Sequence, residues 1–319
     1  MIELGRTIAA WSARLNGFAD PASADDLLTL LRLLYAAGRH DLPLGRLFEG
    51  HVDALQIVSR YGTAGQRDAA VATAQRGGLF GVWNADLPGE PLRLDAGVLR
   101  GGKGFASGAG LLGHALVSVD RDGGRQLILL DLARTPPSID KSWWRTIGMA
   151  RSETHLVRWD AALLDAGDMI GSPGDYVREP WFSGGALRFA AVQAGGVAAL
   201  VDHVAAHLVA TGRAADPHQA GRLAALYGLA QAAAAAVRSA APDAATLARV
   251  SAARVAVYEA ADAAIAIAQQ AVGVQGMFVD HPLSRTLTDL AVYIRQPGPD
   301  AQRMRVGAAV ADGTLSPAL

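Results

Sequence analysis

The stretch that decides the architecture runs from Gly108 to Gly124 and reads GAGLLGHALVSVDRDGG. Its first six residues match the G-x-G-x-x-G pattern of dinucleotide-binding proteins, and Asp131 follows about 20 residues later, as that pattern requires. A Rossmann domain also needs a helix directly after the glycines, so that its N-terminus faces a pyrophosphate. Here the apolar run His114–Val119 follows instead, and Asp120–Gly124 then predicts a hairpin turn. The stretch therefore favours antiparallel β-structure over a Rossmann domain.

Further short apolar runs flank this hairpin between residues 77 and 170, where glycine is frequent. The predicted strands are Leu79–Trp83, His114–Val119, Gln126–Leu132 and Thr154–Trp159. Because no helical period separates them, we expect a small antiparallel barrel or sandwich.

Helical patterns precede and follow this β-rich block. Before it, Ser23 is a predicted N-cap for an apolar helix that ends at Gly38, and a second helix covers about Leu44–Tyr61. After it, the ranges 182–212, 215–240 and 243–271 each predict a long Ala-rich helix, and a last helix begins near Pro282 and stops before Pro297. Long helices with small contact residues indicate a four-helix bundle.

The expected fold is therefore α+β and multidomain. It comprises an N-terminal helical domain of residues 1–76, a middle β-barrel or sandwich of residues 77–175 and a C-terminal four-helix bundle of residues 176–319.

Composition excludes several classes of protein. The 319 residues contain 29 Lys and Arg against 30 Asp and Glu, a net charge of -1, so nothing favours binding to nucleic acid or to an anionic membrane. Cysteine is absent, which excludes disulfides, thiolate metal sites and cysteine nucleophiles. We find neither a secretory signal pattern nor an uninterrupted apolar membrane span, and we expect a cytoplasmic protein.

Two lesser motifs have ordinary explanations. His203 and His207 share one helical face, but residue 204 is Val where a H-E-x-x-H zinc site has a base, so a polar stripe on a bundle helix is favoured and no metal site is predicted. Ser107 and Ser183 lie among glycines, yet neither fits the G-x-S-x-G nucleophile pattern.

Three segments in chain order carry a family resemblance. They are Leu99–Ala109, Gly148–Asp160 and Gln270–Asp289. They resemble, respectively, the L-N-G-x-K-x-W-I-T-N-G, G-M-R-x-S-x-T-x-x-V-x-F-D and Q-x-x-G-G-x-G-Y…P-x-x-R…R-D segments of the acyl-CoA dehydrogenase superfamily. The resemblance covers the chain from about Leu44 onward and implies that superfamily's fold, with a shortened N-terminal block.

The resemblance implies an FAD site. In the family the W-I-T segment flanks the isoalloxazine ring, and Phe105, Ala106 and Ser107 stand at its three positions, with the Ser107 hydroxyl replacing that of the Thr near flavin N5. The family's A-L-T-E-P segment corresponds to Gly81–Ala85, which places Val82 and Trp83 at the cofactor. For Phe105 and Trp83, ordinary core packing is the alternative.

A second cofactor-contacting region is implied near the C-terminus. The family's R-x-x-F, which reaches FAD from a neighbouring subunit, falls on Arg213–Asp216, where Asp replaces Phe. Gln270 and Gly273 keep their positions, whereas Val274 replaces the next Gly. The resemblance and the apolar faces of the Ala-rich helices both point to a homodimer or homotetramer.

The usual catalytic base is missing. A dehydrogenase of this family removes a proton with a Glu carboxylate, and the matching position is Pro297 or Gln296, depending on the anchor used. The alternative position, on the first bundle helix, falls within Ala186–Arg188 and lacks a carboxylate too. The first substitutes to test are Asp168, Asp175 and Glu179, from the connection into the bundle.

The resemblance therefore predicts an FAD-dependent oxidoreductase that acts on a small molecule, with an acyl-CoA or other acyl thioester among the candidates. One alternative is a flavin-dependent monooxygenase of the same fold, because that chemistry does not need the missing Glu. Another is a catalytically silent scaffold or partner subunit.

Overall fold

The computed structural model describes residues 2–15, 17–243, 246–295 and 298–317. They pack as two compact units. Unit 1 comprises residues 1–20, 46–145 and 150–178, and unit 2 comprises residues 21–45, 146–149 and 179–319. The N-terminal helical block contributes to both units, since the boundary falls inside helix α3 (Leu42–Tyr61). The three-domain division at residues 76 and 175 stays a prediction.

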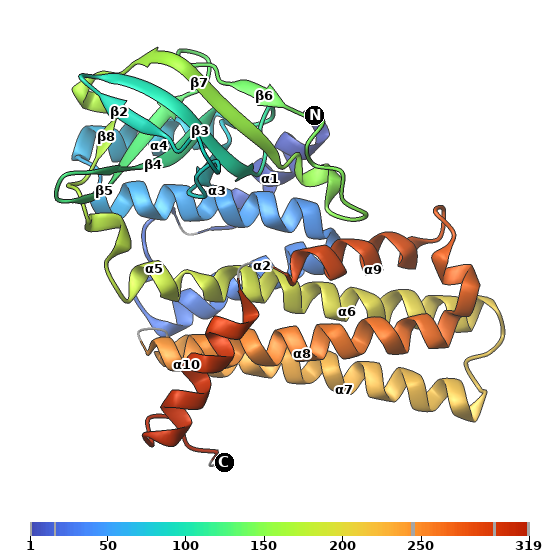
Figure 1. Cartoon of the computed structure of the whole chain (residues 1–319). Helices are drawn as coiled ribbons and strands as arrows, with labels where there is room; N and C mark the ends of the chain where they lie inside the picture. The colour runs from blue at the N-terminus through green and yellow to red at the C-terminus, as the bar shows by residue number, and fades with distance from the viewer. Residues whose placement is uncertain (1, 16, 244–245, 296–297, 318–319) are drawn as a thin grey trace. The chain divides into compact units, whose positions relative to one another are not determined.

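Unit 1 is built on two four-stranded sheets (Figure 1). The strand order is β1-β4-β5-β8 in the first sheet and β2-β3-β7-β6 in the second. All strand pairs are antiparallel except β1 with β4. The strands are β1 (Phe80–Trp83), β2 (Arg93–Asp95), β3 (Val98–Ala106), β4 (His114–Arg121), β5 (Gly124–Asp131), β6 (Ser138–Asp140), β7 (His155–Leu163) and β8 (Met169–Ile170).

The predicted hairpin is confirmed. Arg121 on β4 pairs with Gly124 on β5, so Asp122 and Gly123 form the turn, and Gly123 has a φ of 87° that favours glycine. The glycines at 108–113 form a turn that leads into β4, as expected for a chain without a Rossmann helix. Strand β3 escaped prediction because Gly101, Gly102 and Gly104 interrupt its apolar pattern.

Helix α3 covers the first sheet of unit 1. Ala54, Leu55 and Val58 on α3 belong to one buried core with Phe80 on β1 and Leu116 on β4. The other helices assigned wholly to this unit are α1 (Ile2–Ser12) and α4 (Ala64–Gln75).

The buried His51 ties α3 to β1 through a hydrogen bond. The backbone N–H of Phe80 donates to His51 Nδ1 over 3.1 Å. Burial lowers the pKa of His51 to about 4, so the ring is neutral at pH 7 and its Nδ1 is free to accept.

Unit 2 contains the long helices of the predicted bundle. Helices α6, α7 and α8 pack on one another, and α9 packs on α6 (Figure 1). The helices of this unit are α2 (Ala24–His40), α5 (Trp181–Gly184), α6 (Ala186–Ala210), α7 (Pro217–Ala240), α8 (Leu247–Val272), α9 (Pro282–Tyr293) and α10 (Pro299–Ala311).

Glycines allow α2 to lie close against α6. A Cβ atom on Gly38 would stand 1.9 Å from the carbonyl oxygen of Val192, and one on Gly195 would stand 2.1 Å from that of Tyr35. Ser23 caps α2 as predicted, because its side chain accepts from the Asp26 N–H. The prediction that the helix ends at Gly38 was wrong, because α2 continues to His40. Gly38 instead lets α2 pack closely against α6.

Among the residues that the structure describes, two helical stretches reach the length and hydropathy of a membrane span, Trp181–Ala210 and Pro217–Asp243. The apolar window of the first is 67% buried, as in the core helix of a bundle, whereas that of the second is only 22% buried. We expected from the sequence that no apolar window was long enough to span a membrane, because every Gln, His or charged residue was counted as an interruption. That expectation was wrong for these two stretches.

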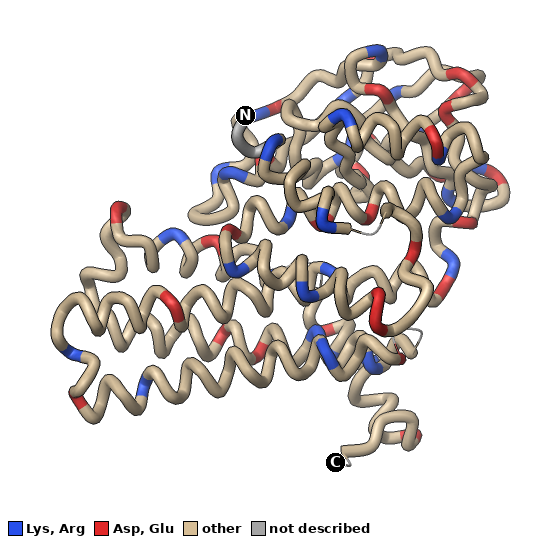
Figure 2. Tube along the Cα trace, turned by 180° about the vertical axis from the view of Figure 1, so that it is seen from behind, with Lys and Arg blue, Asp and Glu red and all other residues tan. Residues whose placement is uncertain are grey.

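Basic and acidic residues are interspersed along both units (Figure 2).

Candidate functional site

Three hydroxyl groups of unit 1 form a hydrogen-bonded relay that ends at Ser107. Thr154 Oγ1 donates to Ser107 Oγ over 3.1 Å, and the Ser152 and Thr154 hydroxyl oxygens are 2.7 Å apart. Since Thr154 uses its single hydrogen on Ser107, Ser152 is the donor to Thr154. Ser107 is 5% exposed, and its own hydrogen has no acceptor among the residues described in the structure. The relay therefore presents one hydroxyl donor at its end.

Strand β1 holds the backbone beside this hydroxyl. The Trp83 indole N–H donates to the carbonyl oxygen of Ser107 over 2.9 Å. Trp83 is 1% exposed and lies near Trp159 of the second sheet, with ring centroids 6.4 Å apart. Trp83 thus lies in the core, where it fixes Ser107, while its neighbour Val82 is half-buried.

Phe105, two residues before Ser107 in the chain, lies on the surface. The pairing of β3 with β7 shifts register between Lys103 and Ala106, and this irregularity gives Phe105 a φ of 52°. Ala106 is fully buried, whereas Phe105 is 52% exposed. A non-glycine residue at positive φ is uncommon and marks a constrained position.

Two tryptophans that no sequence motif indicated, Trp143 and Trp144, extend this aromatic surface. The ring of Phe105 makes edge-on contacts with Trp143, at a centroid distance of 4.9 Å, and with Trp144, at 6.3 Å. Trp143 is 37% exposed. The signal for them was the Trp-Trp pair in a polar loop, Lys141–Arg145, where a core role was improbable. We call Phe105, Trp143 and Trp144 the aromatic cluster.

Lys103 stabilises strand β3, which carries Phe105 and leads into Ser107. Its side chain is fully buried, and the ammonium donates to Asp86 Oδ1, the Asn84 carbonyl and Ser118 Oγ over 2.5, 3.2 and 3.3 Å. Burial lowers the pKa of Lys103, and the bond to Asp86 opposes that shift. The buried ammonium joins β3, β4 and the segment after β1, which fixes both predicted cofactor-contacting segments of this unit.

The predicted residues of unit 2 gather at one end of its bundle. Arg213 follows α6, while Gln270 lies in the last turn of α8 and Gly273, with a φ of 75°, ends it; all three are exposed. Gln219 on α7 joins them: with its amide in the orientation that satisfies both groups, it accepts from Arg213 and donates to the Ala271 carbonyl over 3.3 Å.

The Asp that replaces the family's Phe has a structural role. Asp216 is the N-cap of α7, and its carboxylate accepts from the backbone N–H groups of His218 and Gln219. These bonds, the one from Gln219 first, lower the pKa of Asp216. Asp216 therefore stabilises the start of helix α7.

The three carboxylates considered as replacement bases are engaged locally. Asp168 pairs with Arg134. Asp175 accepts from the Ser172 N–H over 2.8 Å, and Glu179 accepts from the Ser183 N–H over 2.9 Å.

The family places its catalytic base at one of two positions, and the structure describes only one of them in this chain. Ala186–Arg188, which lack a carboxylate, open helix α6. Gln296 and Pro297 lie outside the described residues.

His207, one of the two histidines predicted to share a helical face, pairs with His281 at the start of α9. His207 Nδ1 and His281 Nε2 are 3.2 Å apart, and His281 Nδ1 accepts from the Leu283 N–H. Within the described ranges no three His, Asp or Glu side chains are grouped to hold a metal ion.

Comparison with solved structures identifies the class of fold. The chain has the fold of the acyl-CoA dehydrogenases, and the α+β multidomain architecture predicted from the sequence is confirmed. No family model matches the chain, and no curated protein matches it.

Three solved structures illustrate the likeness. Butyryl-CoA dehydrogenase from Megasphaera elsdenii is 17% identical with a TM-score of 0.77, and the match covers 92% of this chain and 83% of that one. The dibenzothiophene monooxygenase TdsC from Paenibacillus sp. A11-2, solved with FMN and indole, is 16% identical with a TM-score of 0.78, over 98% and 96% of the two chains. The FAD complex of PigA is 14% identical with a TM-score of 0.78, over 94% and 88%.

Proposed function

We propose that the protein is a flavin-dependent oxidoreductase acting on a small molecule, with FAD as its cofactor. The observation that carries this proposal is the Ser152–Thr154–Ser107 relay, which ends in a hydroxyl donor two residues along the chain from Phe105 of the aromatic cluster. A flavin needs both features, a hydrogen-bond partner at the edge of its ring system and an apolar surface that excludes water from its face. When bound, the flavin supplies the electron-transfer chemistry.

The residues of unit 2 support FAD in place of FMN. A guanidinium and a side-chain amide are the donors suited to a pyrophosphate, and Arg213 and Gln270 lie at the same end of the bundle. These two residues and Gly273 would hold the adenylate half, which FMN lacks. Binding of FAD much tighter than of FMN by the apoprotein is the expected result, and equal affinity would contradict this assignment.

Desaturation of acyl-CoA substrates should be slow. General-base catalysis contributes about 10²–10⁴-fold to a rate, and neither family position in this sequence supplies a carboxylate. We expect negligible turnover of straight-chain acyl-CoAs with an artificial electron acceptor. Robust turnover would contradict the proposal, and Asp168→Asn, Asp175→Asn and Glu179→Gln would then locate the base.

A monooxygenase is the second candidate. The missing carboxylate favours it, because oxygen transfer does not need that base, and TdsC supplies a structural precedent. The test is stopped-flow reoxidation with externally supplied reduced flavin: oxygenated product formed only under that condition favours the monooxygenase. Flavin reduction by an acyl-CoA without oxygen favours the dehydrogenase. If the protein binds no flavin under any condition, the remaining alternative, a catalytically silent scaffold or partner subunit, is favoured.

A further inference from the structure

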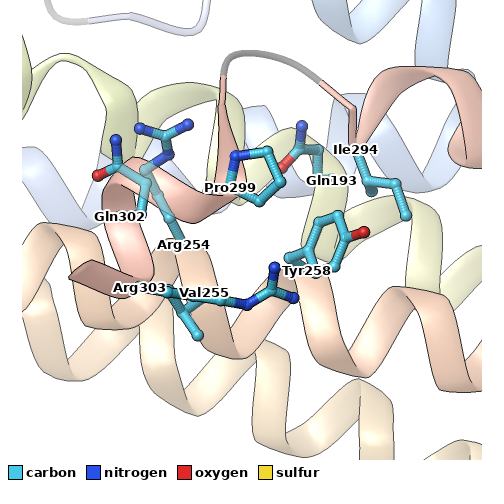
Figure 3. Close-up of a pocket in the computed structure, with 8 residues that line it drawn as sticks. All are labelled: Gln193, Arg254, Val255, Tyr258, Ile294, Pro299, Gln302 and Arg303. Atoms are coloured by element: carbon cyan, nitrogen blue, oxygen red, sulfur yellow. The ribbon is translucent and has the colours of Figure 1, made fainter. Parts of the chain in front are cut away.

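Unit 2 holds a small pocket and a pair of histidines outside the residues assigned to the flavin. The pocket lies between α6, α8 and α10, and Figure 3 shows Gln193, Tyr258 and Gln302 among its lining residues. It offers only about 10 Å³, close to the least space that holds one water molecule, and is too small for a substrate or an oxyanion. The histidine pair has the more definite chemistry.

The hydrogen bonds of His207 and His281 define where both imidazole protons lie. His281 is the N-cap of α9, and its Nδ1 accepts from the Leu283 backbone N–H over 3.2 Å. A neutral imidazole has one N–H, so the proton of His281 is on Nε2, which lies 3.2 Å from His207 Nδ1. His207 Nδ1 is therefore the acceptor of the pair, and the proton of His207 is on its own Nε2.

Neither ring has a nitrogen free to take up a further proton. A proton on His281 Nδ1 would displace the Leu283 N–H and remove the cap of α9. A proton on His207 Nδ1 would face the N–H of His281 and break the bond between α6 and α9. Because each added proton removes one of these two bonds, the bonds exist together only while both rings are neutral.

The positive groups around the pair also oppose protonation. Arg213, which follows α6, lies near His207, and His203 on α6 lies near His281. Burial, then the neighbouring His281 and Arg213, lower the pKa of His207. A proton bound here would therefore add to a region that is already cationic.

Acidic groups do little to offset this positive charge. Asp202, the acidic neighbour of His203, accepts two hydrogen bonds from Arg39, of 2.6 and 2.7 Å. In the described ranges neither histidine of the pair makes a hydrogen bond or an ion pair with the other titratable groups nearest in the chain to this end of the bundle, which are Asp216, His218, Asp280 and Arg285.

We propose that the His207–His281 pair is an acid-sensitive latch, which holds the start of α9 on α6 at neutral pH and releases it below about pH 6. The latched segment runs from the 3₁₀ turn Gly273–Met277 to His281, and it leaves 73% of Val274 and 86% of Val279 exposed, so little apolar burial holds it. Opening also lets water accept from the His207 Nε2–H, which is buried without an acceptor among the described residues.

The latch gives FAD binding a dependence on pH, and this consequence rests on the proposed function. Gly273, which is assigned to the adenylate half of FAD, is the first residue of the latched segment, and Gln270 precedes it by three residues. Release of the segment should therefore weaken the binding of FAD more than that of FMN.

The test is hydrogen exchange of the full-length protein without flavin at about pH 7.5 and about pH 5, corrected for the intrinsic exchange rate at each pH. A histidine that is neutral when closed and titrates at its ordinary pKa when open raises the opening constant ~30-fold between these values. We expect the N–H groups of Leu283 and Ser284 to lose at least about tenfold in protection. The Ile294 N–H, bonded to the Leu290 carbonyl at the other end of α9, is the internal reference and should not change.

Two variants separate the latch from other effects of pH. His281→Asn keeps a capping side chain for α9, since Asn is a preferred N-cap, and removes the titrating ring; it should abolish the pH dependence at Leu283 and Ser284. His207→Gln should reduce that dependence. His218→Asn, at an exposed histidine of α7, is the matched control and should leave it unchanged. Thermal melts check the fold of each variant.

Equal protection of these two N–H groups at both pH values, or the same loss in His281→Asn as in the unmodified protein, would overturn the latch. Retention of FAD at the same pH values tests the consequence for the cofactor. We expect acid to release FAD from the unmodified protein and much less from His281→Asn, and equal release would overturn the link to FAD. A protein that takes up no FAD at about pH 7.5 contradicts the proposed function and leaves the exchange result as it stands.

Discussion

Ser107 is the residue on which the cofactor assignment depends most. Trp83 fixes its carbonyl and Thr154 donates to its hydroxyl oxygen, which leaves the hydroxyl hydrogen to donate to a ligand. Ser107→Ala should cost roughly 0.5–1.5 kcal/mol of binding free energy, a several-fold loss of flavin affinity, and should shift the flavin absorption. Equilibrium dialysis and visible spectra measure both effects. Ser138→Ala, which removes an exposed hydroxyl of β6, is the matched control. If Ser107→Ala changes flavin affinity and the flavin spectrum no more than Ser138→Ala does, Ser107 only caps a turn.

His51 provides a pH-dependent contribution to stability. In the unfolded chain a histidine takes up a proton near its ordinary pKa of 6.5, whereas the folded protein holds His51 neutral down to about pH 4. Between these values the unfolded chain binds more protons, so the free energy of unfolding falls as the pH falls, by ~3 kcal/mol in all.

His51→Asn keeps an acceptor for the Phe80 N–H and removes the titration. Urea unfolding at a series of pH values should therefore give a flatter profile for this variant between pH 6.5 and 4. Parallel profiles for the two proteins would mean that His51 is not the group responsible.

At the scale of elements, the sequence predicted those whose patterns are complete. Strands β1, β4, β5 and β7 and the long helices α6, α7 and α8 have continuous apolar patterns, and the structure confirms each of them within a few residues. Strand β3 was missed because its glycines hide the alternation, and α10, beyond Pro297, was missed because it has no apolar stripe, with Ala309 its one buried residue among those described.

The candidate site was only partly predictable for a related reason. The motif indicated Phe105 and Ser107, but their different surroundings, one on the surface and one buried, follow from the irregular pairing of β3 with β7. The donors Ser152 and Thr154 come from a distant segment, and Trp143 and Trp144 come from a loop without a pattern. Such contacts depend on tertiary packing, which a single sequence does not display.

The contact between α2 and α6 gives a test at this scale. Gly195→Ala should destabilise the protein by about 1–3 kcal/mol, since the new methyl group would meet the Tyr35 carbonyl oxygen and force the helices apart. Gly307→Ala is the control on α10: nothing lies within 4 Å of its Cβ position, and helix propensity predicts a gain of about 0.5–1 kcal/mol. Chemical denaturation measures both changes. A stabilising Gly195→Ala would contradict the close contact.

At the scale of the whole molecule, helix α7 predicts self-association. It belongs to an apolar stretch whose most hydrophobic window is only 22% buried, and it exposes 58% of Tyr227. A second copy of the chain would cover this surface, and a homodimer or homotetramer is the expected state. Sedimentation at micromolar concentration should give at least the mass of two chains. Tyr227→Arg should weaken the assembly, whereas Leu163→Arg, at an exposed apolar position of β7, should not. The mass of one chain for the unmodified protein would refute this prediction.

The central claim is that the fold binds a flavin through the Ser107 relay and the aromatic cluster. The most direct measurement is the visible absorption spectrum of the purified full-length protein, before and after incubation with FAD and removal of unbound cofactor. We expect a yellow protein that retains FAD in proportion to chain concentration and, as the Ser107→Ala variant, loses part of it. A colourless protein that takes up neither FAD nor FMN under any condition would contradict it.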